Sequence, residues 1–376
     1  MKKVIIATAL SVVASAHLFA ADSIEGAFAA GKTTGDISLY TLSTNNSGST
    51  ADTGYTTGSV AIKYSTDSYL GLKANVGVRA TGLFNEKTNG NYNDANKEIV
   101  NIANLEYTRG KGTLIVGRQP VDLEWISDYH NAAVGILDLN PLTLVAGYTE
   151  SKAVAKPDLV LGKFAKFNEN KGAYTLDATY DIAGHAKANA YYLDAPDLFS
   201  AVGGKIGVTM AGVDAFVKYA TTKEDVAGTP DGKIYAAQLG YTLAGVNLAA
   251  GYVKTDKTGG AGSLPAIGDN ICPLDLGSSI YGLVYVKDAK TTYGKVSTDV
   301  AGFTLGAVYA SIDHAEYTAA AEGSPTFSKG TDKELDLTVQ KDIAKNLTAK
   351  VLYTNISAEV ASNDQSYISA LLTYKF

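Results

Sequence analysis

Three carboxylates and the only tryptophan of the chain fall in one short break between strand-like segments. Asp122, Glu124 and Asp128 lie there with Trp125. Such a group of acids has three interpretations: part of a catalytic site, a charge filter for solutes, or a solvated surface loop. The elements that place the side chains decide among them.

The catalytic interpretation requires a histidine paired with a serine or an acid. His130 follows Asp128 closely, and His314 follows Asp313, but adjacent strand residues point to opposite faces. His185 adjoins a tight turn, and no spacing typical of metal ligands occurs. We therefore expect no enzyme, no metal site and no cofactor.

The first twenty residues have the pattern of a secretory signal peptide. Met1–Lys3 is basic, residues 4–13 are apolar, and Leu18–Ala20 precedes the predicted cleavage after Ala20. Cleavage after Ala16 is the alternative. Residues 21–376 contain no linker rich in proline or serine and are predicted to form one domain.

Charge and cysteine content limit the partners of the mature chain. Without Lys2 and Lys3, 30 basic residues face 38 acidic ones, a net charge of −8. This balance argues against nucleic acid as a partner. Cys272 is the single cysteine, so no internal disulfide can form, and we interpret it as an isolated loop thiol.

Apolar and polar residues alternate along many segments. In residues 69–80 the even positions from Leu70 to Val78 are apolar, whereas the odd positions from Gly71 to Arg79 are small or polar. This period predicts strands with one face toward hydrocarbon and the other toward water. Tyrosine often closes the apolar row, as in the aromatic girdle of a membrane barrel.

Short and long connections alternate between these strands. Eight tight turns, four of them ending in Ala-Gly, alternate with nine longer polar connections. A β-sandwich also alternates in polarity but does not predict this sidedness. We predict an all-β fold, a single antiparallel up-and-down transmembrane β-barrel of about 18 strands, with 16 as the alternative. Residues 278–286 within loop 257–288 could form an extra hairpin arm, which would change the strand count.

The face opposite the apolar rows carries charges of both signs, which cannot be buried dry. The predicted lumen is therefore filled with water and forms a channel. The inward charged residues are Lys63, Lys73, Arg79, Lys187, Lys205, Lys218, Lys350, Asp36, Glu106, Asp177, Asp181, Asp214, Glu334 and Asp336.

The acidic break becomes the third long loop, residues 119–131. Folded into the lumen, it would narrow the channel and set its acids against basic wall residues. Pro120 can start a helical turn that projects Glu124 and Asp128 to one side, with Trp125 packing the loop against the wall. An ordinary surface loop is the alternative.

Several motifs resemble those of the OprD-type outer-membrane porins, in particular the major porins of epsilonproteobacteria. The motifs are residues 19–22 at the end of the signal, the short segment Ser23–Phe28, Gly117–Pro120, Leu123–Trp125 with Asp128, and the terminal Phe376.

The resemblance implies an 18-stranded barrel in the outer membrane, with both termini periplasmic, loop three inside the pore, and passive diffusion of small hydrophilic solutes and ions. It implies basic wall residues opposite loop acids, and contact of Phe376 with the barrel-assembly machinery. A homotrimer is one form of assembly in this group. The residues that match a constriction are Asp122, Glu124, Asp128, Arg118, Arg79 and Lys73.

The chain departs from this pattern in its arginines. It has only Arg79, Arg109 and Arg118, and lysines lack the planar two-pronged grip of a guanidinium on a carboxylate. We therefore expect a general porin rather than substrate-specific uptake. Arg118 also shares the parity of Leu114 and Val116, so it faces lipid unless a bulge or strand end intervenes.

Some alternatives stay open at this stage. A surface-exposed adhesin-like or structural barrel would act through its long outer loops, such as 257–288 and 314–331. The net charge of −8 and the loop acids favour cations, whereas lumen lysines oppose this preference. Residues 22–31 form either one or two helical turns or no regular structure.

Overall fold

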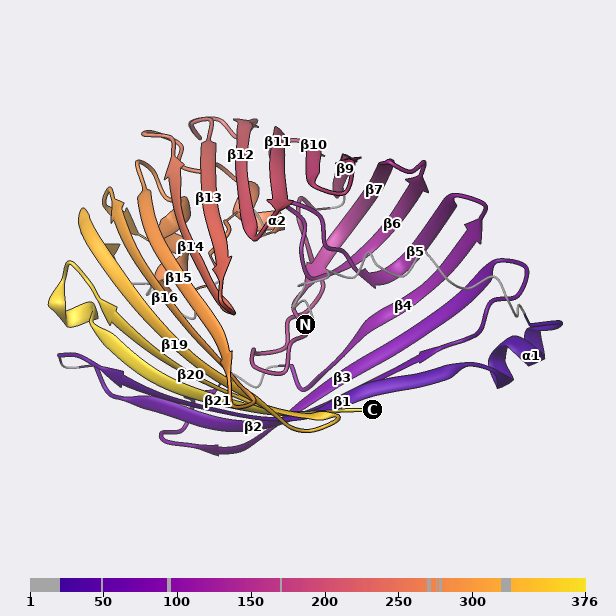
Figure 1. Cartoon of the computed structure of the whole chain (residues 1–376), viewed down its shortest axis with the longest axis horizontal. Helices are drawn as coiled ribbons and strands as arrows, with labels where there is room; N and C mark the ends of the chain where they lie inside the picture. Colours follow the sequence, from indigo (N-terminus) through magenta and orange to yellow (C-terminus); the bar gives the residue numbers. More distant parts are fainter. Residues whose placement is uncertain are drawn as a thin grey trace.

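The chain folds into a barrel of antiparallel strands (Figure 1). The computed structural model describes residues 21–48, 50–92, 96–169, 171–268, 272–274, 276, 279–318 and 326–376. The predicted signal peptide, residues 1–20, lies outside them, so its cleavage stays a prediction.

Eighteen strands form the closed barrel, as predicted. In chain order they are β1 (Lys32–Asn46), β2 (Thr53–Ser65), β3 (Leu72–Glu86), β4 (Glu98–Arg109), β5 (Gly112–Pro120), β6 (Tyr129–Asp138), β7 (Leu142–Ala153), β9 (Ala173–Ile182), β10 (Ala186–Ala195), β11 (Phe199–Met210), β12 (Val213–Glu224), β13 (Lys233–Leu243), β14 (Val246–Thr255), β15 (Lys290–Val300), β16 (Phe303–His314), β19 (Gly330–Ala344), β20 (Leu347–Ser357) and β21 (Gln365–Lys375). Short β8 (Ala165–Lys166) extends the edge of β7, and β17 (Tyr317–Thr318) pairs with β18 (Thr326–Phe327).

The barrel closes through the first and last strands. β1 pairs with β21 from Asp36 opposite Lys375 to Asn46 opposite Gln365. Just beyond the end of β21, the amide of Gly35 donates to the carbonyl of Phe376 at 2.9 Å, and the amide of Phe376 donates to the carbonyl of Gly35 at 3.0 Å. No edge of the sheet is left open at this seam.

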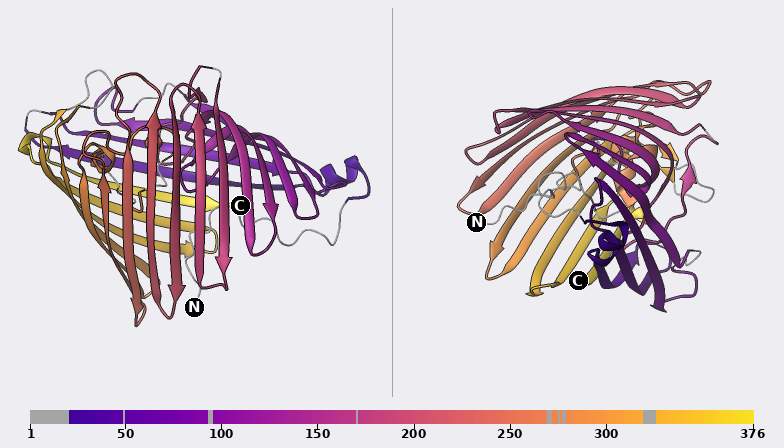
Figure 2. Two further views of the ribbon diagram at one scale, coloured as in Figure 1. Left: turned by 90° about the horizontal axis from the view of Figure 1, so that it is seen from above. Right: turned by 90° about the vertical axis from the view of Figure 1, so that its right-hand side faces the viewer.

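Helical segments in the described residues are short. They are α1 (Ile24–Ala29), α2 (Leu264–Ile267), η1 (Ser279–Tyr285) and η2 (Ala361–Asn363). α1 resolves the open alternatives for residues 22–31, and its Ala27 carbonyl accepts a bond from Asp67 in a short turn. Figure 2 shows α1 at one edge of the barrel. Among the described helices, none has the length and apolar content needed to span a membrane.

The outer wall has the predicted apolar face. Ile206, Val217 and Leu239 are 56%, 59% and 62% exposed although each is large and apolar. Exposed tyrosines accompany them, including the contacting pair Tyr219 and Tyr235 on β12 and β13. A surface of this kind matches the hydrocarbon of a bilayer.

The predicted Ala-Gly turns have the geometry of tight hairpins. At Ala211-Gly212, φ is +51° and +82°, and at Ala301-Gly302 it is +51° and +78°. Two consecutive positive φ angles are those of a type I′ turn, whose twist matches that of the flanking strands. The short connections therefore hold the strand register at one end of the barrel.

A lysine on the outer wall tests the orientation of the strands. Val217→Lys places a charge in hydrocarbon and should cost about 2–4 kcal/mol of unfolding free energy in lipid vesicles, measured by urea titration. Ser297→Lys, on the inward face of β15, should leave the unfolding free energy nearly unchanged. Equal losses in both variants would contradict the assignment of faces.

Candidate functional site

The third long connection is a tight hairpin that we call loop L3, residues 121–128. Its backbone closes between the Val121 amide and the Asp128 carbonyl at 2.9 Å, and between Leu123 and Ile126 at 2.8 Å. The predicted helical turn after Pro120 is therefore wrong, because the strand ladder continues into the loop. The predicted limits 119–131 are also too wide, since β5 runs to Pro120 and β6 starts at Tyr129.

Glu124 fixes L3 to the inner wall. Its Oε1 accepts from Lys218 Nζ at 2.8 Å, and its Oε2 accepts from Lys205 Nζ at 3.1 Å. The Lys218 side chain is only 4% exposed, against 33% for Lys205. Because the two lysines belong to β11 and β12, the loop between β5 and β6 is tied to strands on a different part of the barrel.

Trp125 supplies the apolar contact of L3, as predicted. It is fully buried, and its ring meets the edge of Tyr191 on β10 with centroids 3.8 Å apart. Leu193 and Phe199, on neighbouring strands, belong to the same buried cluster. L3 therefore lies against the inner wall through a dry contact beside the ion pair.

The described part of a second long connection, which we call loop L7 (residues 256–289), packs against L3. Gly268 of L7 lies so close to the Trp125 carbonyl that a Cβ would clash with it. Lys152 Nζ on β7 also donates to the Ile267 carbonyl at 3.3 Å. L3 and L7 therefore pack together as one unit.

The expectation of a hairpin arm at residues 278–286 is wrong for the described residues of that segment. Ser279–Tyr285 forms the 3₁₀ helix η1, and Ile280, Leu283 and Val284 are almost completely buried. Ile280 and Leu283 are three residues apart and therefore share one side of a 3₁₀ helix. The strand count consequently stays at eighteen.

The apolar inner surface that receives L7 was not predicted from the sequence. Leu193, Ile234, Val253 and Ile312 occupy inward positions, yet each is at most 2% exposed. Apolar residues on both faces of these strand segments were the available signal, because a wall against water would alternate.

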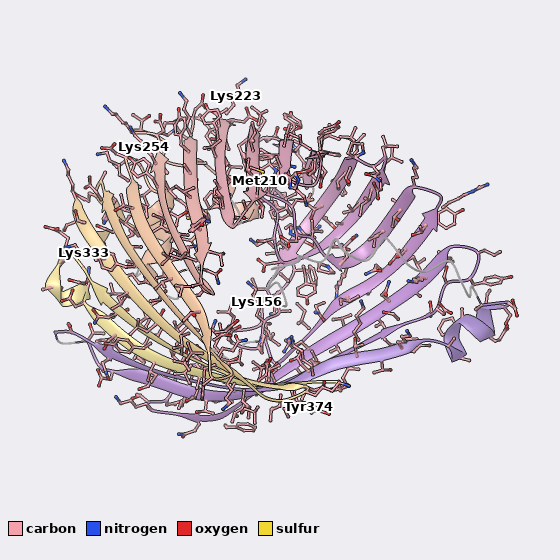
Figure 3. All side chains as sticks on the ribbon, viewed as in Figure 1. Lys156, Met210, Lys223, Lys254, Lys333 and Tyr374 are labelled. Atoms are coloured by element: carbon pink, nitrogen blue, oxygen red, sulfur yellow. The ribbon has the colours of Figure 1, made fainter. Side chains whose placement is uncertain are left out.

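The second predicted acid, Asp128, contacts a separate pair of lysines. Its carboxylate lies 3.8 Å from Lys152 Nζ and 3.7 Å from Lys156 Nζ. Figure 3 places Lys156 within the outline of the barrel. Asp122 is half-buried at the start of L3.

The predicted basic residues are not the described partners of Glu124. Arg79 instead binds Asp36 through two bonds of 2.6 and 3.0 Å and Ser59 through one of 2.7 Å. Lys73 lies opposite Glu106 in the ladder between β3 and β4.

Arg118 follows the parity of its strand. It donates to the Val100 carbonyl at 2.9 Å, and its guanidinium lies 4.6 Å from the Phe164 ring. Leu114 and Val116 are exposed and lie four and two residues before Arg118 in β5. Because alternate residues of a strand share a face, Arg118 lies on the outward face, as its position in the sequence indicated. A role of Arg118, Arg79 or Lys73 in a constriction therefore remains a prediction without a described contact to L3.

His130 holds the end of L3 where β6 begins. Its Nε2 lies 2.8 Å from the Ser127 carbonyl and its Nδ1 lies 2.8 Å from the Thr149 hydroxyl. A neutral ring with its proton on Nε2 satisfies both contacts. This arrangement supports the loop, and the described residues contain no cluster of three or more metal-ligand side chains.

Comparison with known proteins gives structural matches of low sequence identity. No family model and no curated protein sequence matches the chain. Among solved structures, OccK9 (OpdG) of Pseudomonas aeruginosa matches with a TM-score of 0.75 and 14% identity over 94% of this chain and 100% of that one. OpdO of the same species gives a TM-score of 0.74 and 12% identity over 94% and 98%. OccAB1 of Acinetobacter baumannii gives 0.73 and 13% over 92% and 96%.

These neighbours are OprD/Occ-family porins. The chain shares their fold. The match spans nearly the whole of each protein. At sequence identities of 12–14%, the matches support a shared fold but do not indicate which solute passes.

A double-mutant cycle tests the Glu124 pair. Glu124→Gln leaves the buried Lys218 ammonium without its carboxylate and should cost about 3 kcal/mol of unfolding free energy. Glu124→Gln combined with Lys218→Met removes both charges and should recover part of that loss. If the loss in the double variant equals the sum of the losses in Glu124→Gln and in Lys218→Met measured separately, the two residues do not form a direct pair.

The contact between L3 and L7 gives a second test. Gly268→Ala should push L7 away from the Trp125 carbonyl and speed cleavage within residues 256–289 by a soluble protease. Gly282→Ala is the matched control, because nothing lies within 4 Å of a Cβ at that position. Equal cleavage rates in the two variants would show that L7 does not depend on this contact.

Proposed function

We propose that the protein is an outer-membrane porin through which small hydrophilic solutes and ions diffuse passively. The water-filled barrel is narrowed by L3, and the process uses no cofactor and no chemical step. The observation that carries this proposal is the bond of Glu124 to β11 and β12, because it sets a loop from β5 and β6 against a distant part of the inner wall.

The charges around L3 supply a filter for the proposed channel. Glu124 and Asp128 together contact four lysines: Lys152, Lys156, Lys205 and Lys218. Fixed charges near a narrow passage act strongly on ions that have lost part of their water. Within these pairs the lysines outnumber the carboxylates and favour anions, whereas Asp122 of L3 and Asp177, which interacts electrostatically with Glu124, favour cations.

The alternative of an adhesin-like barrel receives less support. It depends on long loops that project outward, but L7 packs against L3 and the inner wall through Gly268, Leu283 and Val284. The surface that L7 presents to a partner is reduced accordingly.

The proposed orientation places the short turns in the periplasm. α1 contacts the turn at Asp67, and Phe376, just beyond the end of β21, is bonded to Gly35 near the start of β1, so both ends of the described chain lie with the short turns. Phe376 is then positioned for the barrel-assembly machinery. A homotrimer stays a prediction for the assembly.

Planar-bilayer recording of the purified mature protein in a salt gradient tests the function. We expect stepwise conductance, a shift of the reversal potential toward anions in Glu124→Gln, and the opposite shift in Lys205→Gln. Each variant changes one fixed charge beside the passage.

Asp52→Asn is the control for these recordings. Asp52 lies in the long connection between β1 and β2, where it pairs with Lys87 and is exposed. Its substitution should not change the reversal potential. If the wild-type protein shows no conductance, the proposal of a porin is wrong. If the protein conducts but every variant has the same reversal potential, L3 does not line the passage.

A further inference from the structure

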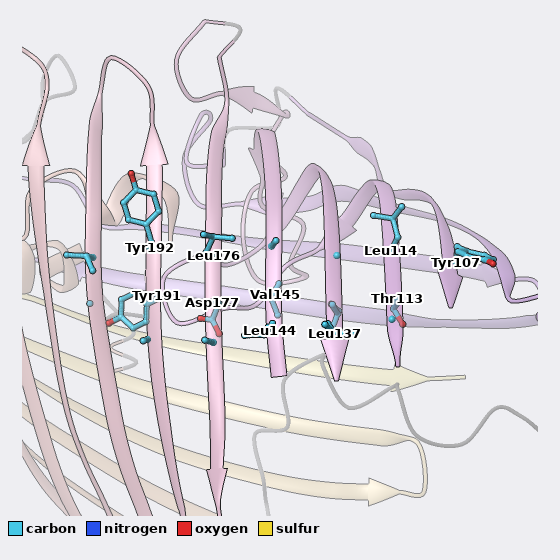
Figure 4. A pocket seen from close by; sticks show the side chains of 18 of the residues that line it. Tyr107, Thr113, Leu114, Leu137, Leu144, Val145, Leu176, Asp177, Tyr191 and Tyr192 are labelled. Carbon is cyan, nitrogen blue, oxygen red and sulfur yellow. The ribbon is translucent and has the colours of Figure 1, made fainter. Parts of the chain in front are cut away.

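A groove of about 920 Å³ crosses the outer wall between β4 and β11. Its volume lies within the range of about 300–1,000 Å³ found for ligand pockets. Large exposed apolar side chains line it, among them Leu114, Leu137, Leu176, Tyr192 and Val202. Figure 4 shows four of the apolar groups, Leu114, Leu137, Leu176 and Tyr192, on neighbouring strands.

Small residues create the depression. Gly135 lies opposite Ala146 between β6 and β7, and Ala178 lies opposite Ala190 between β9 and β10. All four line the groove and have the outward parity of their strands. Leucines at neighbouring outward positions raise the surrounding surface, so the wall is hollowed over these two pairs.

A cationic group lies at the end of the groove beside the short turns. Arg109 is the last residue of β4, is exposed, and lines the groove with Tyr107. The other arginines, Arg79 and Arg118, are engaged by Asp36 and by Val100 with Phe164. Within the described part of the chain, Arg109 forms no ion pair.

We propose that this groove binds a phospholipid, with an acyl chain over Gly135, Ala146, Ala178 and Ala190 and the phosphate on Arg109. The inference rests on the proposed membrane location. A guanidinium can donate two parallel hydrogen bonds to a phosphate, and it lies where the rim of the wall meets the head groups. The apolar floor offers the chain contacts that a flat wall lacks.

The charge complementarity favours a phospholipid over a second copy of the chain. A second copy would have to present both an apolar surface to the floor of the groove and a carboxylate to Arg109 at its end. A phospholipid fills the apolar floor and supplies the anion in one molecule.

Native mass spectrometry of delipidated protein with added phosphatidylglycerol tests the proposal. One tightly bound lipid is expected for the wild type. Arg109→Gln and Ala178→Phe should each weaken binding about tenfold, because one removes a charge-assisted contact and the other fills the floor. Lys345→Gln in another short turn and Ala370→Phe on the outward face of β21 are the matched controls and should bind as the wild type does.

Three results would overturn the lipid site. They are equal binding in all five proteins, no bound lipid on the wild type, or an oligomer that Ala178→Phe dissociates without altering the lipid count. Bilayer recordings of the same samples separate this proposal from the porin itself. Arg109→Gln and Ala178→Phe should conduct normally, so a missing lipid with intact conductance refutes the lipid site alone.

Discussion

The pairing of every backbone group across the wall is the constraint on which the rest of the structure depends. Hydrocarbon offers no hydrogen bonds, so a sheet inside it must close on itself. The ladder of β1 with β21 provides this closure. Once the sheet is closed, the period of two determines which strand side chains point inward, among them Lys205 and Lys218, and L3 brings Glu124 to these two lysines.

The Glu124 pair then organises the interior. A buried ammonium such as that of Lys218 is tolerable only with a carboxylate beside it, and L3 brings that carboxylate from another part of the barrel. Trp125 and the apolar residues of L7 complete a dry unit on the same wall. The interior is therefore divided between an apolar packing of loops and charged groups that line the proposed passage.

Local patterns were sufficient to predict the strands and turns. Alternation identified the outer face, and Ala-Gly steps such as Ala211-Gly212 marked hairpins, because both signals act over a few residues. The partners of Glu124 were not predictable in this way, since Lys205 and Lys218 lie 81 and 94 residues along the chain. Only the closed sheet brings them together. The parity of Arg118 was available and indicates the outer face, whereas the resemblance favoured the lumen.

The packing of L7 shows a different limit of the sequence. Segments such as Ser279–Tyr285 are apolar and β-branched, which suits a buried strand and a buried helix equally. The inward apolar residues Ile234 and Val253 could have decided between them, because they mark a wall covered by protein.

Accessibility of Lys205 from the passage tests the central claim most directly. In a Cys272→Ser background, Lys205→Cys would be treated with a negatively charged thiosulfonate during single-channel recording. The account predicts a stepwise fall in current and a shift toward cations as each channel is modified, because the side chain lies beside L3 in the conducting path. Complete modification, verified by mass, without any change in current would contradict it.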